Sequence, residues 1–278
     1  MDDKLSISNT DQEDKSKMCG KDKGENTLEK QELKYDIQLA DLIIEVYPRY
    51  PTLKEFCKDY ICSEDVIKHS SQDKRLTIRI TDEDINKEKE MSEEEWTPQY
   101  LETLAALRKI SDQMPEYHRF LCHGAAITWK EKGYLFTAPS GTGKSTHISL
   151  WRKYLGEDVQ IVNGDKPFMK AEGEEIKIYG SPWAGKEGWQ KNRSTTLDAI
   201  CILEQSKENK IKKLEPSQSV PRLIRQIYFT ENAAYAGKTL ELMDLLLKKV
   251  PVYLLECDIS KEAVRCSFEA LTGMSMQE

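Results

Sequence analysis

A glycine-bearing loop near the middle of the chain constrains the fold more than any other feature. Residues 138–145 read APSGTGKS, and Thr146 follows them. The pattern G-x-x-x-x-G-K-[ST] binds phosphate where it joins a strand to a helix, and here only its first glycine is missing, replaced by Ala138. The apolar run YLFTA precedes the loop, and KSTHISLWRKYLG, with apolar residues at helical spacing, follows it. These neighbours predict a strand, a phosphate-binding loop and a helix, and therefore an α/β protein.

The residue types in this loop suit a bound phosphate. Gly141 and Gly143 allow successive backbone N–H groups to turn toward an anion, and the positive end of the helix dipole adds to their effect. Lys144 supplies a full positive charge, and the Ser145 hydroxyl can ligate Mg²⁺. An ordinary glycine turn is the alternative, and the intact GKST sequence behind an apolar strand disfavours it. We expect nucleotide contacts from Ser140, Gly141, Thr142, Gly143, Lys144, Ser145 and Thr146.

A carboxylate for the metal follows in the sequence DVQIVNGDK. Its apolar residues predict a short buried strand, and Asp165 lies just past the end of that strand. A carboxylate in this relation to a phosphate-binding loop holds Mg²⁺ directly or through water. Asn163-Gly164 is also a turn signal, so an aspartate in a plain turn is the alternative. Behind a GKST helix we favour the metal role, and we expect Ser145 and Asp165 to ligate Mg²⁺.

Charge and apolar content exclude several classes of protein. A formal net charge of −7 argues against a nucleic-acid binder that depends on phosphate contacts. No run of about 18 apolar residues is present to span a membrane, and the first residues lack the apolar stretch of a signal peptide. The 7 cysteines include no CxxC pair, which favours reduced thiols over a zinc site. We expect a cytoplasmic protein that binds neither nucleic acid nor membrane, and a homo-oligomer stays open.

Composition and periodicity divide the chain into three regions. Residues 1–31 are acidic and have almost no large apolar side chains, so we expect a disordered tail. Residues 32–95 predict a small, strand-rich α+β domain, and residues 96–278 the domain that contains the phosphate-binding loop.

The small domain is expected to contain one strand in YDIQLADLIIEVY, a short helix in TLKEFCKDYIC and a second strand in RLTIRITDEDI. The charge run INKEKEMSEEE predicts a solvated loop or helix face. The next helix begins with Thr97 as N-cap and Pro98 at the first position, and it ends before Pro115. AAITW and YLFTA predict a hairpin with a turn at KEKG, and the last two helices flank a strand in VPVYLLECDI.

The segment GSPWAGKEGWQKNRS is unusually rich in glycine, tryptophan and basic residues. A loop of this kind can close over a nucleotide and balance the charge that develops on a transferred phosphoryl group. We expect Arg193 to supply positive charge and Glu187 to accept a proton. A basic surface loop anchored by Trp183 is the alternative.

One stretch resembles a known family. CHGAAITWKEKGYLFTAPSGTGKST is similar to the HPr kinase/phosphorylase group and, more loosely, to the ATP-dependent phosphoenolpyruvate carboxykinases that share its core. His123-Gly124 stands 21 residues before Lys144, the spacing associated with this family. YGSPWAGKEGWQKNRSTTLDAICILEQ resembles a segment of HPr-kinase-like proteins of bacteria. The resemblance covers about residues 118–260 and implies a P-loop core of the HPr kinase and carboxykinase type behind the small amino-terminal domain.

The resemblance also implies roles for individual residues. His123 would lie near the terminal phosphate, Lys144 would contact phosphate, and Asp165 would ligate Mg²⁺. This chain departs from the family at Gly164-Asp165, where two adjacent aspartates are usual. The carboxy-terminal signature of the phosphorylase function is also not evident. A general base for the acceptor is therefore missing, and we expect His123 first, and Glu187 second, to replace it.

We expect an ATP- and Mg²⁺-dependent kinase that transfers a phosphoryl group to a hydroxyl, with serine of a protein or peptide, or a small molecule, as acceptor. Two alternatives are open. One is an ATP-binding regulatory protein with weakened catalysis, which Gly164 suggests. The other is a kinase that modifies a precursor peptide in a natural-product pathway.

Overall fold

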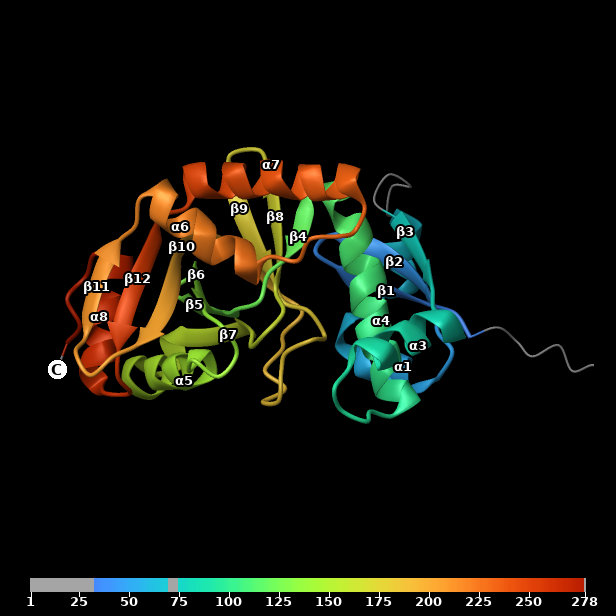
Figure 1. Cartoon of the computed structure of the whole chain (residues 1–278), viewed down its shortest axis with the longest axis horizontal. Helices are drawn as coiled ribbons and strands as arrows, with labels where there is room; N and C mark the ends of the chain where they lie inside the picture. The colour runs from blue at the N-terminus through green and yellow to red at the C-terminus, as the bar shows by residue number, and fades with distance from the viewer. Residues whose placement is uncertain (1–32, 70–74, 278) are drawn as a thin grey trace, which may run out of the picture. The chain divides into compact units, whose positions relative to one another are not determined.

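Two β-sheets and the helices around them make up residues 33–69 and 75–277, the part of the chain that this computed structural model describes (Figure 1). The fold is of mixed α/β class, as predicted. The predicted disordered tail, residues 1–31, lies outside the described residues.

The smaller sheet has the strand order β1-β2-β3. β1 (Tyr35–Leu39) pairs antiparallel with β2 (Leu42–Tyr47), and β3 (Arg75–Arg79) runs parallel to β2. The prediction of one continuous strand here was wrong, because the chain reverses between β1 and β2. Ala40 and Asp41 form the turn with φ values of 50° and 61°. A turn with two positive φ values usually carries asparagine or glycine, and the Ala40-Asp41 pair lacks that signal.

Helices surround this sheet: α1 (Thr52–Phe56), η1 (Lys58–Tyr60), α2 (Glu64–His69), α3 (Asp82–Met91), α4 (Pro98–Gln113) and η3 (Met114–Tyr117). The charge run after residue 81 is helical because Thr81 and Asp84 form a capping box at the start of α3. The predicted start of α4 is confirmed, since the Thr97 hydroxyl accepts a hydrogen bond from the Tyr100 N–H at 3.3 Å and Pro98 is the first residue.

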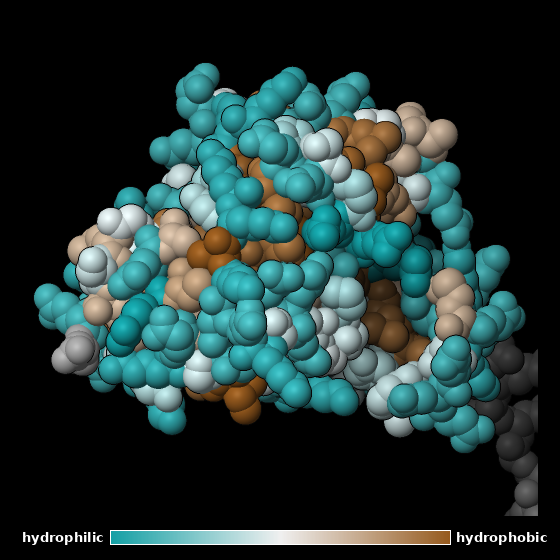
Figure 2. Space-filling model, turned by 60° about the vertical axis from the view of Figure 1, so that its left-hand side comes forward, coloured by the Kyte–Doolittle hydropathy of each residue, from teal (hydrophilic) through white to brown (hydrophobic). Residues whose placement is uncertain are grey.

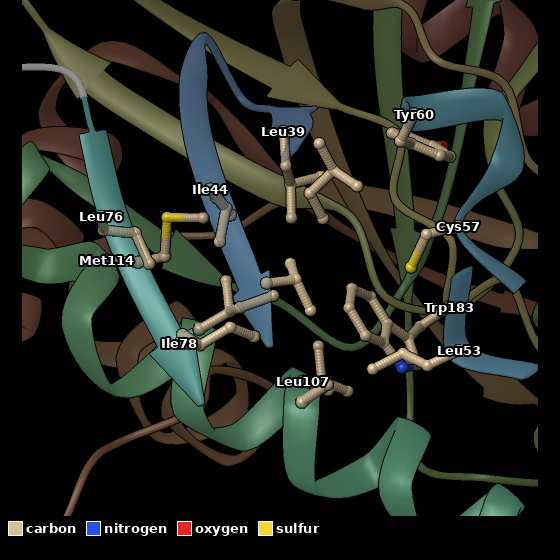
Figure 3. Close-up of a cluster of buried hydrophobic side chains, with 14 of the residues drawn as sticks. Leu39, Ile44, Leu53, Cys57, Tyr60, Leu76, Ile78, Leu107, Met114 and Trp183 are labelled. Atoms are coloured by element: carbon tan, nitrogen blue, oxygen red, sulfur yellow. The ribbon is translucent and has the colours of Figure 1, made fainter. Parts of the chain in front are cut away.

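The core beside the smaller sheet draws side chains from widely separated parts of the sequence (Figure 3). Ile44 and Ile78 come from the strands, Leu107 and Met114 from α4 and η3, and Trp183 from a much later segment. The indole N–H of Trp183 donates to the backbone oxygen of Thr103 at 2.8 Å. Apolar packing therefore continues across residue 95, where the sequence predicts a domain boundary.

The larger sheet has the order β4-β8-β9-β10-β6-β5-β7, with β12 beside β10 and β11 beside β12. Its strands are β4 (Arg119–Leu121), β5 (Ala125–Trp129), β6 (Lys132–Thr137), β7 (Val159–Asn163), β8 (Phe168–Glu172), β9 (Glu175–Tyr179), β10 (Ser194–Gln205), β11 (Lys210–Lys213) and β12 (Val252–Cys257). β10 starts antiparallel to β9 and then lies parallel to both β6 and β12. The predicted hairpin of β5 and β6 is confirmed, with a turn shortened to Lys130 and Glu131.

Helices cover this sheet: α5 (Lys144–Leu155), η4 (Gly156–Asp158), α6 (Pro216–Leu223), η5 (Ile224–Gln226), α7 (Ala233–Lys249) and α8 (Lys261–Thr272). α5 packs beside α8, and α7 crosses over β4, β8 and β9 (Figure 1). Polar side chains predominate on the face in Figure 2, where apolar ones form separate patches. No helix in residues 33–69 and 75–277 combines the length and apolar character needed to cross a membrane.

The segment 181–191 lies directly on the turn that follows β7. The Gly164 N–H donates to the Trp189 oxygen at 2.8 Å, and the Lys166 N–H donates to the Trp183 oxygen at 3.2 Å. A Cβ atom at Gly164 would lie 2.6 Å from the backbone oxygen of Ala184, closer than packing allows. Glycine at position 164 is therefore a packing requirement of this fold.

His147 is buried on the inner face of α5. Its Nε2 lies 3.0 Å from the Ser267 hydroxyl and 3.2 Å from the Trp151 indole nitrogen, and its ring lies against Phe136. Burial lowers the pKa of His147 to about 4. The folded protein therefore holds this imidazole in its neutral form.

The close approach at Gly164 predicts a size limit at that position. Gly164→Ala should destabilise the protein by about 1–3 kcal/mol, because the added methyl group displaces backbone. Gly237→Ala is the matched control, since no atom lies within 4 Å of its added Cβ and it is inside α7. The control should be neutral or stabilising by up to about 1 kcal/mol. Urea unfolding measures both changes, and an unaltered stability of Gly164→Ala would contradict the packing argument.

The buried imidazole predicts an acid-sensitive stability. The ordinary histidine pKa is 6.5 and the folded value is about 4, so the unfolded chain binds the proton more tightly. The neutral imidazole therefore contributes to the free energy of unfolding in full above pH 6.5. This contribution, on the order of 2–3 kcal/mol, is lost as the pH falls toward 4. Urea unfolding at pH 7 and pH 4.5 should show a smaller acid loss in His147→Gln than in the wild type. His118→Asn, at an exposed position, should keep the full loss, and an equal loss in His147→Gln would exclude His147 as its cause.

Candidate functional site

The predicted phosphate-binding loop joins β6 to α5 as the sequence indicated. Gly141 and Gly143 have φ values of 79° and 113°, in the left-handed region that favours glycine. α5 begins at Lys144, and no side chain caps its first turn. Helix N–H groups without a capping acceptor, at the positive end of the dipole, form an anion-binding site when a glycine loop precedes them.

Lys144 lies folded over this loop. Its ammonium group donates to the backbone oxygens of Ala138 at 3.0 Å and Pro139 at 3.4 Å. The residue is only 7% exposed, and burial lowers its pKa despite the attraction of Asp165. A phosphate bound beside the ammonium group would restore the preference for the charged form.

A cavity of about 440 Å³ opens in front of the loop and brings together most of the predicted site. Its lining includes His123, Ser140, Gly141, Gly143, Lys144, Ser145, Thr146, Asp165 and Glu187. Gly164, Gly185 and Lys186 complete the wall. One space is therefore lined by four segments: the residue His123 before β5, the glycine loop, the turn after β7 and the segment 181–191.

Asp165 is the electrostatic centre of this cavity. One carboxylate oxygen lies 3.2 Å from His123 Nε2, and the other accepts from the Lys166 ammonium at 2.9 Å. Burial alone would raise the pKa of this carboxyl, but the His123 hydrogen bond and the Lys166 charge outweigh it and lower the pKa to about 2. Asp165 is therefore ionised at neutral pH.

The donors in the cavity fit Mg²⁺. The ion prefers oxygen ligands and is usually bound by one or two protein groups together with phosphate and water. An ionised carboxylate from Asp165 and a hydroxyl from Ser145 line the same space. No cluster of three or more histidine, cysteine or acidic side chains suited to a metal occurs in the described ranges.

His123 is oriented from both sides. Its Nδ1 lies 3.0 Å from the side-chain oxygen of Gln226, and its backbone N–H donates to the Gln226 oxygen at 2.7 Å. Both ring nitrogens thus lie beside polar side chains, Gln226 on one side and Asp165 on the other. The next residue also contacts Asp165, since the Gly124 N–H donates to the Asp165 backbone oxygen at 2.9 Å.

Two predicted residues lie apart from this cavity. Arg193 donates to the Gln160 side chain and lines a different cavity, beside Lys191. Thr142 points its hydroxyl back to the Pro139 oxygen at 2.9 Å and lines the two spaces that flank the loop. The roles assigned to both residues stay predictions.

The segment 181–191 has a tryptophan anchor, as the alternative interpretation expected, and it also lines the cavity. Trp183 anchors it in the core, and three residues later Lys186 and Glu187 reach the cavity. Sequence reasoning missed Gln226 and Lys166, which contact His123 and Asp165. Gln226 follows α6 in a short 3₁₀ turn far along the chain, and no motif marks it.

Comparison with known proteins adds one family and one distant structure. Among solved structures, the Hpr(Ser) kinase/phosphatase from Coxiella burnetii is 12% identical, with a TM-score of 0.32, and the similarity covers 55% of this chain and 93% of that chain. This likeness is distant, and no residue role is taken from it. No curated protein matches the sequence.

The family described as SynChlorMet cassette protein ScmC matches residues 88–264. These residues include α4, the predicted phosphate-binding loop, Asp165 and the segment 181–191. Since the match spans more than half of the 278 residues, the protein belongs to the ScmC family of SynChlorMet cassette proteins.

Proposed function

We propose that this protein transfers the terminal phosphoryl group of ATP to a hydroxyl acceptor. The observation that carries the proposal is the shared cavity, in which the glycine loop, Lys144, Ser145 and Asp165 face His123 and Glu187. A loop alone would support binding, whereas groups on its opposite wall provide places for an acceptor and for its proton. This is the arrangement that phosphoryl transfer requires, because its catalysis is mainly positioning and charge stabilisation.

The loop side would hold the nucleotide. Backbone N–H groups of the loop and the first turn of α5 would contact the phosphates, and Lys144 would leave the loop oxygens to pair with a terminal phosphate. Ser145 and Asp165 would hold Mg²⁺, which when bound neutralises charge on the phosphates. His123, placed against Asp165, would add positive charge or a hydrogen bond beside the terminal phosphate.

The opposite wall would hold the acceptor. Glu187 is exposed at the cavity, so its carboxylate can meet a hydroxyl group. His123 can accept a proton only after it gives up a contact with Asp165 or Gln226. We therefore assign the base role to Glu187 first and keep His123 as a positioning and charge-stabilising residue, a change from the order that the sequence suggested.

The family sets the context for the acceptor. A cassette protein fits a natural-product pathway, which favours a peptide or small-molecule hydroxyl of that pathway. The regulatory alternative, in which the chain binds ATP without transfer, predicts a cavity that holds nucleotide and yields no product. The two proposals are separated by one measurement, the transfer of phosphate from ATP to an acceptor, which only the kinase performs.

Lys144 should carry a large share of the nucleotide affinity. Lys144→Ala should weaken ATP binding at least about tenfold, since it removes a charge-assisted contact to phosphate. Lys153→Ala, at an exposed position on the same helix, is the control and should bind as the wild type does. Titration calorimetry measures both affinities. Unchanged ATP affinity in folded Lys144→Ala would refute the loop as the phosphate site.

Asp165 should matter for transfer more than for folding. Asp165→Asn should reduce phosphoryl transfer on the order of 10²-fold, because charge stabilisation in a phosphoryl-transfer site typically contributes this much. The measurement is transfer of labelled terminal phosphate from ATP to acceptors in a host lysate, with exposed Asp158→Asn as control. Full activity in Asp165→Asn would place the catalytic carboxylate elsewhere. A wild type that binds ATP but neither transfers nor hydrolyses it would favour the regulatory role.

A further inference from the structure

A second cavity, of about 370 Å³, adjoins the candidate site on the α5 side. The two cavities share Gly141, Gly143 and Thr146. The far wall of the second cavity comes from the ends of β10 and β12, the strands that follow β6 in the parallel part of the sheet. A nucleotide whose phosphates lie against the loop can therefore extend past Thr146 into this space.

We propose that the second cavity binds the base of the nucleotide and selects a base that presents an amino group, as adenine does. This inference rests on the proposed ATP-dependent function and adds the place where the base binds and the side chain that selects it. Leu150, Leu203 and Ile259 supply apolar carbon to the lining. Ile259 is 76% exposed, an unusual value for a large apolar side chain, and a flat base beside it would cover part of that surface.

Several polar side chains line the cavity, among them Glu204 and Gln205, and we assign the selection of the base to Asp258. One of its carboxylate oxygens accepts hydrogen bonds from the Asn209 side chain at 3.0 Å, the Ser260 N–H at 2.9 Å and the Ser260 hydroxyl at 2.6 Å. None of the described groups donates to its other oxygen. The Ser260 hydroxyl lowers the pKa of this carboxyl, so the free oxygen belongs to a carboxylate and can only accept.

The free oxygen of Asp258 matches one amino donor. The exocyclic amine of adenine supplies such a donor. In hypoxanthine or guanine a carbonyl oxygen occupies the same ring position, and its partial negative charge would repel the carboxylate. Guanine also presents two adjacent donors that suit both oxygens of a carboxylate, and here Asp258 has already committed one oxygen to three donors.

The cavity on the other flank of the loop fits the base less well. It measures about 530 Å³, and its lining includes Arg222, Arg225 and Glu204. The two guanidinium groups donate and cannot accept, and the Glu204 carboxylate already pairs with Arg222 at 3.4 Å. This cavity also lacks Thr146 from the first turn of α5, where the phosphates would end.

The test compares base preference with phosphate binding. Calorimetry measures affinities for ATP, ITP and inorganic tripolyphosphate in wild type, Asp258→Asn and the exposed control Asp244→Asn. Asparagine at position 258 can keep its oxygen toward Asn209 and Ser260, so its amide nitrogen would donate where the carboxylate accepted. We expect at least about tenfold preference for ATP over ITP in the wild type and the control, and a loss or reversal of that preference in Asp258→Asn. Tripolyphosphate affinity should be equal in all three proteins.

Several results would overturn the inference. Equal affinity of the wild type for ATP and ITP, or an unchanged preference in Asp258→Asn, would remove Asp258 as the base-selecting group. Loss of the preference in Arg225→Ala, with Asp258→Asn unaffected, would place the base in the other flanking cavity. Failure of the proposed function gives a distinct result: Lys144→Ala would then bind ATP and tripolyphosphate as the wild type does, or neither ligand would bind at all.

Discussion

The close contact between the segment 181–191 and the turn after β7 determines the shape of the candidate site. Gly164 has no room for a side chain because the Ala184 oxygen lies where a Cβ would be. Backbone hydrogen bonds from Gly164 and Lys166 hold the segment in place, and Trp183 fixes its start in the core. The contact brings Glu187 to the cavity in front of the glycine loop. The glycine that appeared to be a missing catalytic aspartate therefore makes room for a different carboxylate.

Asp165 lies in the cavity between the segment 181–191 and the glycine loop, and its charge acts on both sides. Its carboxylate faces His123, Lys166 and, at longer range, Lys144. These three side chains come from different parts of the chain, so the cavity forms only when the segment before β5, the turn after β7 and the start of α5 are brought together. A site that concentrates positive charge around one ionised carboxylate is suited to a phosphate accompanied by a divalent cation.

Local signals in the sequence predicted the elements that depend on local chemistry. The loop before Lys144, the cap at Thr97 and the β5–β6 hairpin follow from glycine, capping and alternation patterns, and the structure has all three. The β1–β2 turn was missed because Ala40 and Asp41 carry no hairpin signal. Gln226 was missed because its contact with His123 spans 103 residues, and only the tertiary fold creates it.

The central claim is that the cavity between the loop and the segment 181–191 holds the terminal phosphate of a nucleotide. An experimental structure with Mg²⁺ and a non-hydrolysable ATP analogue tests it most directly. The account predicts the terminal phosphate beside Lys144 and Asp165, with Glu187 facing it across the cavity. A terminal phosphate bound away from Lys144, for example beside Arg222 and Arg225 in the flanking cavity, would contradict the account.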